Sequence, residues 1–161
     1  MFKEYNPIKK KRLQVMDNDG KIINKKYFPN ITDEQALKAY KDMLFARTAD
    51  LMIVSYQRQG RIYTYPPNYG QEAIAGAVAQ LARHEDWVVP AFREMGLYLA
   101  KGASLKELFL FFMGYEEGSK FEKSKNMLPV SVPIASQLLH ASGIGYEINY
   151  RKKDQIVYTF V

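Results

Sequence analysis

Arg93 follows a short apolar run, residues 87–91, that is typical of a β-strand. A short helix is expected over residues 92–101. If this helix begins near Phe92, its free backbone N–H groups and the positive end of its dipole face the same space as the Arg93 guanidinium. Together these groups would form a receptor for a phosphate or a diphosphate. The alternative is a surface arginine that pairs with Glu94.

A second candidate site is the turn around Pro133, where oxygen-bearing side chains lie close to the start of a predicted helix. We expect Pro133 in the first turn of this helix, Ser131 as its cap, and Ser136 and Gln137 nearby. Hydroxyl, amide and backbone carbonyl oxygens together can hold a hard cation. A plain capped helix would explain the same residues. The predicted apolar face of the helix consists of Ile134, Leu138, Ala141, Gly145 and Ile148.

Other familiar catalytic groupings are missing from the sequence. His84 lies in a polar stretch, and His140 lies on a predicted helix as a core or interface residue or as a proton-transfer group. Two histidines so far apart in sequence do not indicate a metal site. The absence of cysteine excludes disulfides, cysteine nucleophiles and thiolate metal sites. Gly143 and Gly145 lack the third glycine and the preceding strand of a dinucleotide-binding motif.

A long helix is predicted from residue 32 to Arg58. Thr32 and Gln35 have the spacing of a capping box, and Gly60 is the expected residue after the C-terminus. Large residues recur along this helix at helical spacing and form an apolar stripe: Leu37, Tyr40, Leu44, Thr48, Leu51 and Val54.

The remaining predicted elements are helices and single strands. Residues 71–82 should form a helix that is apolar nearly all round, which is typical of a buried helix. Ser104 and Glu107 form a second capping box, which begins a helix that ends at Gly114. Residues 156–161 are an almost unbroken apolar strand, as in a parallel sheet buried on both faces. The sequence therefore predicts an α/β protein with few strands.

Residues 1–31 form a predicted basic arm, in which the turn signal Asp17–Gly20 indicates a short hairpin. The net charge of +6 lies largely in this arm, so one alternative is a nucleic-acid-binding protein. Basic terminal arms are more often solvated, and we expect no nucleic-acid partner. The longest apolar run, residues 108–113, is far shorter than the ~20 residues of a membrane span. With no secretory signal recognised, we expect a cytoplasmic protein without a membrane partner.

Several stretches resemble, in order and spacing, the α subunit of the heterotetrameric pyruvate dehydrogenase, a thiamine-diphosphate-dependent 2-oxo acid dehydrogenase. They are Tyr56–Ile62 leading into Asn68–Ala73, Asp86 and Trp87 followed by Phe92 and Arg93, Leu108–Gly118, Leu128 and Pro129, and Pro133–Leu138 with His140 and Ala141. The resemblance covers residues 32–161. It implies a helix-rich N-terminal part of a thiamine-diphosphate-binding fold, a partial domain truncated at an early strand of the parallel sheet.

The resemblance also assigns roles to the two candidate sites. A tyrosine–arginine pair of the family contacts the cofactor, and the matching residues here are Phe92 and Arg93, so the ionic contact is retained and the tyrosine hydroxyl is lost. Ile134 matches the apolar residue that packs at the aminopyrimidine ring. A structural potassium ion is held in some relatives by the segment that matches Ser131, Pro133, Ser136 and Gln137.

The activity implied by the resemblance is the oxidative decarboxylation of pyruvate, with acetyl transfer to the lipoyl acyltransferase of the complex. Pyruvate is favoured over branched-chain oxo acids by overall similarity alone. The partner would be a β subunit in an α2β2 heterotetramer. A non-catalytic module that keeps only the subunit-binding surface is the alternative.

Magnesium binding is where the sequence departs from the family. The family binds Mg²⁺ through a Gly-Asp-Gly motif after the strand that matches residues 156–161. This chain has no such motif, and its single Asp-Gly pair is Asp19 and Gly20. A diphosphate needs the charge of the metal. We therefore expect the chain alone to bind the cofactor weakly and to be inactive.

Overall fold

The computed structural model describes residues 4–9 and 12–161. The chain divides into two compact units, Met1–Asp33 and Glu34–Val161. Within the first unit, two short 3-10 helices flank a turn: η1 (Pro7–Lys9) and η2 (Lys25–Tyr27). The Asp17 carboxylate accepts hydrogen bonds from the N–H groups of Asp19 and Lys21 at 3.0 and 2.8 Å. The turn is closed by a single antiparallel bridge between Met16 and Ile22, where the sequence predicts two short strands.

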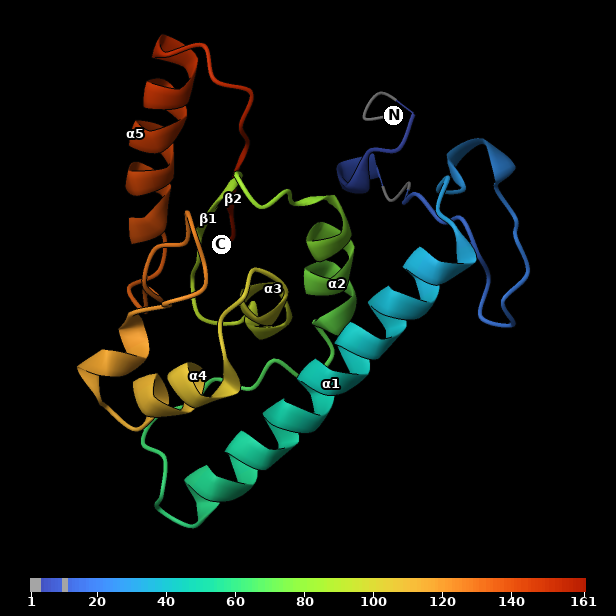
Figure 1. Ribbon diagram of the computed structural model, residues 1–161. Helices are drawn as coiled ribbons and strands as arrows, with labels where there is room; N and C mark the ends of the chain where they lie inside the picture. Colours follow the sequence, from blue (N-terminus) through green and yellow to red (C-terminus); the bar gives the residue numbers. More distant parts are fainter. Residues whose placement is uncertain (1–3, 10–11) are drawn as a thin grey trace. The chain divides into compact units, whose positions relative to one another are not determined.

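The second unit consists of helices around a small parallel sheet, which confirms the predicted α/β class (Figure 1). Its elements in chain order are α1 (Asp33–Arg58), α2 (Glu72–Leu81), β1 (Trp87–Val89), α3 (Met95–Ala100), α4 (Leu105–Phe112), η3 (Glu116–Ser119), α5 (Ser136–Tyr150) and β2 (Val157–Thr159). α5 packs beside both strands, and α3 packs against α2. Among the described residues, no helix is both long and apolar enough to cross a membrane.

The predicted ends of α1 and the predicted start of α4 are close to those observed. α1 ends at Arg58, and Gly60 follows it with a φ of +72°, a conformation that glycine adopts without strain. Ser104 and Glu107 form the predicted capping box: the Ser104 hydroxyl accepts from the Glu107 N–H at 3.2 Å, and the Glu107 carboxylate accepts from the Ser104 N–H at 2.6 Å.

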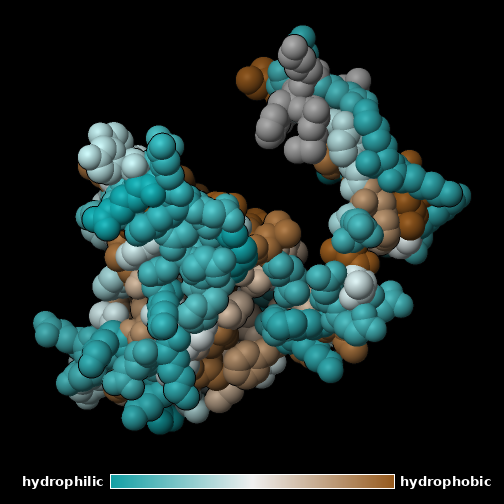
Figure 2. Space-filling model, turned by 45° about the horizontal axis from the view of Figure 1, so that its top comes forward, coloured by the Kyte–Doolittle hydropathy of each residue, from teal (hydrophilic) through white to brown (hydrophobic). Residues whose placement is uncertain are grey.

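Most of the apolar stripe of α1 does not pack in this unit, although Val54 contacts the core. Four of its large residues are each more than half exposed: Leu37, Tyr40, Leu44 and Leu51. The buried residues of α1 lie on another face: Ala46, Ala49, Asp50 and Ile53. Small side chains on this face allow close approach of the neighbouring helices. On the face of the molecule drawn in Figure 2, brown hydrophobic areas lie among the teal hydrophilic ones.

Two expectations about burial are wrong. α2 is not buried all round, because Ile74 and Leu81 are exposed and it packs through Ala75 and Gly76. A Cβ on Gly76 would lie 2.9 Å from the Met43 side chain of α1, so the two helices meet through the glycine. β2 is shorter than expected and only half-buried, because β1 is its single neighbouring strand among the described residues.

β1 and β2 run parallel, with Trp87 opposite Val157. Their register is fixed just before each strand by Asp86, which is 0% exposed. Its carboxylate accepts from the Ile156 N–H at 2.9 Å and from the Arg83 guanidinium at 3.0 Å. Burial opposes the charged form of Asp86, but the hydrogen bonds from Arg83 and Ile156 outweigh it, so the pKa of Asp86 is lowered.

Replacing Asp86 with alanine should lower the free energy of unfolding by about 2–4 kcal/mol, because a buried N–H group and a guanidinium lose their acceptor. Denaturant unfolding measures this. Since the pKa is lowered in the folded state, the contribution of Asp86 is complete above the ordinary aspartate pKa and is lost as the pH falls through the folded value. The difference between wild type and Asp86→Ala should therefore shrink below about pH 4.

Asp154→Ala is the matched control. The Asp154 side chain also bonds Arg83, at 2.9 Å, but is 97% exposed. Its loss should cost less than about 1 kcal/mol. Equal effects of the two substitutions would contradict the role assigned to Asp86.

Candidate functional site

A pocket of about 250 Å³ is lined by members of both candidate groups, Gln137 being the one expected potassium ligand among them. Its lining residues come from the segments after β1, before α2, at the start of α5 and after β2: Gln71, Ala91, Phe92, Arg93, Glu94, Ile134, Gln137 and Val161. The Ser131 N–H donates to the Ala91 carbonyl at 3.1 Å and ties the segment before α5 to the end of β1. The pocket therefore lies beyond the carboxyl ends of the parallel strands, where open α/β folds bind ligands.

The Arg93 guanidinium carries its charge into this pocket without an ion pair. Among the described residues, no carboxylate lies within 4.0 Å of it. Its Nη1 donates to the Pro67 carbonyl, which leaves further N–H donors for a ligand. The neighbouring Glu94 carboxylate accepts from the Arg93 N–H at 3.2 Å and from the Tyr98 hydroxyl at 2.6 Å. Glu94 therefore does not neutralise the guanidinium, in contrast to the alternative raised from the sequence.

The expected helix N-terminus beside Phe92 is not present. α3 begins three residues later, at Met95, because Glu94 has a non-helical backbone with φ of −110° and ψ of 34°. The Met95 N–H is already satisfied by the Asn68 side-chain oxygen at 3.1 Å. The anion-binding capacity of this segment consequently rests on the Arg93 side chain and not on free N–H groups of a helix.

The second expected helix start is also displaced. α5 begins at Ser136 and Pro133 lies before it, because Ala135 has a left-handed backbone with φ of +68°. Ser131 does not cap the helix, since its hydroxyl lies 2.7 Å from the Ser136 hydroxyl. Ser136 in turn donates to the Pro133 carbonyl at 2.8 Å. Three of the four residues expected to hold potassium thus bring oxygen atoms together.

Gln137 is the fourth of these residues and is 1% exposed. Its Nε2 donates to the Phe160 carbonyl, one residue beyond β2, whereas its buried Oε1 has no hydrogen-bond partner among the described residues. A buried amide oxygen without a donor is uncommon and is a candidate ligand atom. Ile134 also lines the pocket and is 77% exposed.

A buried polar network lies beside the pocket, and its residues were not predicted from the sequence as functional residues. The Asp50 carboxylate of α1 accepts from the Tyr65 hydroxyl at 2.5 Å and from the Asn68 N–H at 2.7 Å. The one sequence signal that could have identified it is a charged residue, Asp50, between the small residues on one face of α1. Its partners lie 15 and 18 residues further along the chain, so spacing within α1 alone does not identify them.

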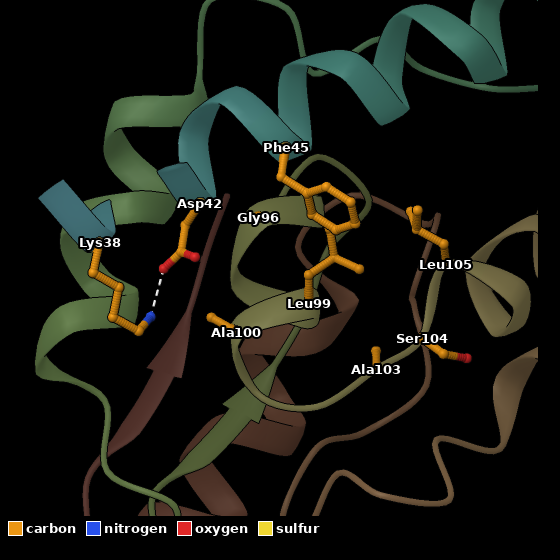
Figure 3. A pocket seen from close by; sticks show the side chains of 9 residues that line it. All are labelled: Lys38, Asp42, Phe45, Gly96, Leu99, Ala100, Ala103, Ser104 and Leu105. Atoms are coloured by element: carbon orange, nitrogen blue, oxygen red, sulfur yellow. Dashed lines mark hydrogen bonds and ion pairs between the residues drawn. The ribbon is translucent and has the colours of Figure 1, made fainter. Parts of the chain in front are cut away.

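A larger pocket, about 480 Å³, lies between α1 and the segment from α3 to α4 (Figure 3). Its two charged residues, Lys38 and Asp42, form an ion pair with each other at 2.5 Å. Phe45 and Leu99 supply apolar surface to the same pocket. Because the charges are mutually neutralised, this pocket offers less to an ionic ligand than the pocket at Arg93.

Residues 40–161 match the protein family described as Dehydrogenase E1 component. The chain is 34% identical over 148 residues to the pyruvate dehydrogenase E1 component subunit alpha of Mycoplasma genitalium, covering 92% of this chain and 41% of that protein. It is 37% identical over 140 residues to the corresponding subunit of Acholeplasma laidlawii, covering 87% and 41% of the two chains. The subunit of Staphylococcus aureus (strain Mu50) is 31% identical over 148 residues, covering 92% and 40%.

The chain therefore spans about two fifths of the length of these curated relatives. The matched segment contains α2 to α5, both strands and every residue that lines the pocket at Arg93. On this similarity, and with a fold of the expected class, the chain belongs to the dehydrogenase E1 component family.

Proposed function

We propose that this chain supplies the α-subunit side of the cofactor site of a pyruvate dehydrogenase. The observation that carries the proposal is the shared pocket, which is lined both by an arginine that forms no ion pair with a described residue and by an exposed apolar residue. Arg93 would bind the diphosphate of thiamine diphosphate, and Ile134 would pack against its aminopyrimidine ring. Phe92 has no hydroxyl to offer the cofactor, and its ring lies against the Arg93 guanidinium, with 5.7 Å between the guanidinium carbon and the ring centroid.

The residues present fit two parts of the cofactor, its diphosphate and its aminopyrimidine ring. The guanidinium offers several donors to phosphate oxygens, and Ile134 offers apolar surface to a ring. A volume of about 250 Å³ is below the ~300 Å³ at which sites for whole small-molecule ligands begin, so a second surface would cover the remainder. When bound, the cofactor supplies the carbanion chemistry, and the residues of this chain bind and orient it.

We propose no magnesium site on the described residues, because the Gly-Asp-Gly motif that binds Mg²⁺ in the family does not occur in this sequence. Potassium fits better, because the Ser131 and Ser136 hydroxyls, the Pro133 carbonyl and the unpartnered Oε1 of Gln137 are neutral oxygen ligands. We assign potassium to these four residues as part of the proposal.

The proposed reaction is the decarboxylation of pyruvate, followed by acetyl transfer to the lipoyl group of an acyltransferase. The relatives carry the name of the pyruvate dehydrogenase E1 component, which supports this substrate. The proposed partner is a β subunit in an α2β2 heterotetramer. The exposed large apolar residues of α1 support a partner subunit, because monomeric proteins rarely leave such residues clustered in water.

Arg93→Ala should raise the KM for thiamine diphosphate on the order of 10- to 100-fold in the enzyme assembled with its β subunit, because a charge-assisted contact to the diphosphate is lost. Steady-state assays over a range of cofactor concentrations measure this. The matched control is Arg61→Ala, since Arg61 is exposed and stacks over Tyr56 at 4.4 Å, outside the pocket. An unchanged KM for Arg93→Ala would overturn the assignment of the diphosphate to this pocket.

The 161-residue chain alone should bind thiamine diphosphate weakly, with or without magnesium, because one arginine does not balance a polyanion in a half-open pocket. Isothermal titration calorimetry of the purified chain measures this directly. Submicromolar binding to the chain alone would contradict the proposal that the described residues make only one side of the site.

A further inference from the structure

Asp50 is a buried carboxylate that forms no ion pair with any residue the structure describes. It is 1% exposed, and its hydrogen-bond donors are the Tyr65 hydroxyl and the Asn68 N–H. Its second oxygen, Oδ2, is buried and has no partner among the described residues. Burial of a carboxylate that is only partly hydrogen-bonded is costly, so packing alone does not account for an aspartate where Ala46 and Ala49 serve on the same helix face.

Asn68 extends this contact to the start of α3. Its Nδ2 donates to the Tyr65 hydroxyl and to the Pro66 carbonyl, both at 3.1 Å. Its Oδ1 accepts from the Met95 N–H at 3.1 Å. The side chain therefore fixes the loop on one side and the first residue of the helix on the other.

The Tyr65 hydroxyl is held as a hydrogen-bond donor. Burial raises its pKa, and the neighbouring Asp50 carboxylate raises it further. The ring packs edge-on against Phe112, with centroids 4.7 Å apart. Both the polar and the apolar part of Tyr65 are thus fixed.

The network is connected to Arg93 on two sides, through the backbone that follows Arg93 and through the loop that its side chain contacts. Its backbone lies two residues before Met95, and its guanidinium donates to the carbonyl of Pro67, the residue before Asn68. None of Asp50, Tyr65 and Asn68 lines the pocket. We propose that Asp50, Tyr65 and Asn68 are positioning residues that set the cofactor affinity of the assembled enzyme through Arg93.

This inference rests on the proposed function, because it takes Arg93 to be the diphosphate ligand. It adds that the hydrogen bonds accepted by Asp50, and not the charge of its carboxylate, set the cofactor affinity. Both donors to Asp50 bond the same oxygen, Oδ1, and an asparagine retains an oxygen there. Asp50→Asn should therefore keep most of the cofactor affinity, and Asp50→Ala should lose it.

The test is a double-mutant cycle in the assembled enzyme, read as the KM for thiamine diphosphate and as kcat at saturating cofactor. Asn68→Ala should raise the KM on the order of tenfold and leave kcat within about twofold. In an Arg93→Ala background, Asn68→Ala should raise the KM no further, because its effect passes through Arg93. Gln57→Ala is the matched control: its amide also joins α1 to a loop carbonyl, that of Tyr63, at 2.9 Å.

Tyr65→Phe removes one hydroxyl and keeps the ring, so it tests the network if Asn68→Ala fails to fold. Additive effects of Asn68→Ala and Arg93→Ala, or an unchanged KM in Asn68→Ala and Tyr65→Phe, would overturn the positioning role. An unchanged KM in Arg93→Ala alone would overturn the proposed function instead, so the two failures are distinguishable.

Discussion

The parallel pairing of β1 with β2 is the constraint on which the pocket depends. Parallel strands place their carboxyl ends at one edge of a sheet, so the chain segments that follow them meet there. The Asp86 carboxylate fixes this pairing by bonding the N–H of Ile156, just before β2. Ser131 then bonds the Ala91 carbonyl and brings the segment before α5 to the same edge. Arg93 and Ile134 line one pocket because of these contacts.

Local signals predicted the elements of the fold well. The capping box of Ser104 and Glu107 and the glycine after α1 depend on a few neighbouring residues, and both are observed as expected. The packing face of α1 was not predicted. The helical spacing of large apolar residues indicated one stripe, whereas the helix packs mainly through smaller residues on another face. The periodicity of a sequence identifies an apolar face of a helix, but it does not show which neighbouring element or chain covers that face.

The candidate site was predicted by residue but not by local structure. Arg93 was identified from its place after the predicted strand, Ile134 received its role from the family resemblance, and the structure places the two residues together. Both helix starts were misplaced, because the Asn68 side chain satisfies Met95 from a distant loop and Ala135 adopts a left-handed backbone. Neither feature has a short-range sequence signal. Contacts between distant segments therefore decide the geometry of the pocket, and they are the part that sequence spacing reveals least.

A crystal structure of the assembled enzyme with thiamine diphosphate tests the central claim most directly. We expect a diphosphate oxygen within about 3 Å of the Arg93 guanidinium. The aminopyrimidine ring should lie within about 4.5 Å of the Ile134 side chain. A diphosphate bound away from the carboxyl ends of β1 and β2, with Arg93 and Ile134 both out of contact with the cofactor, would contradict it.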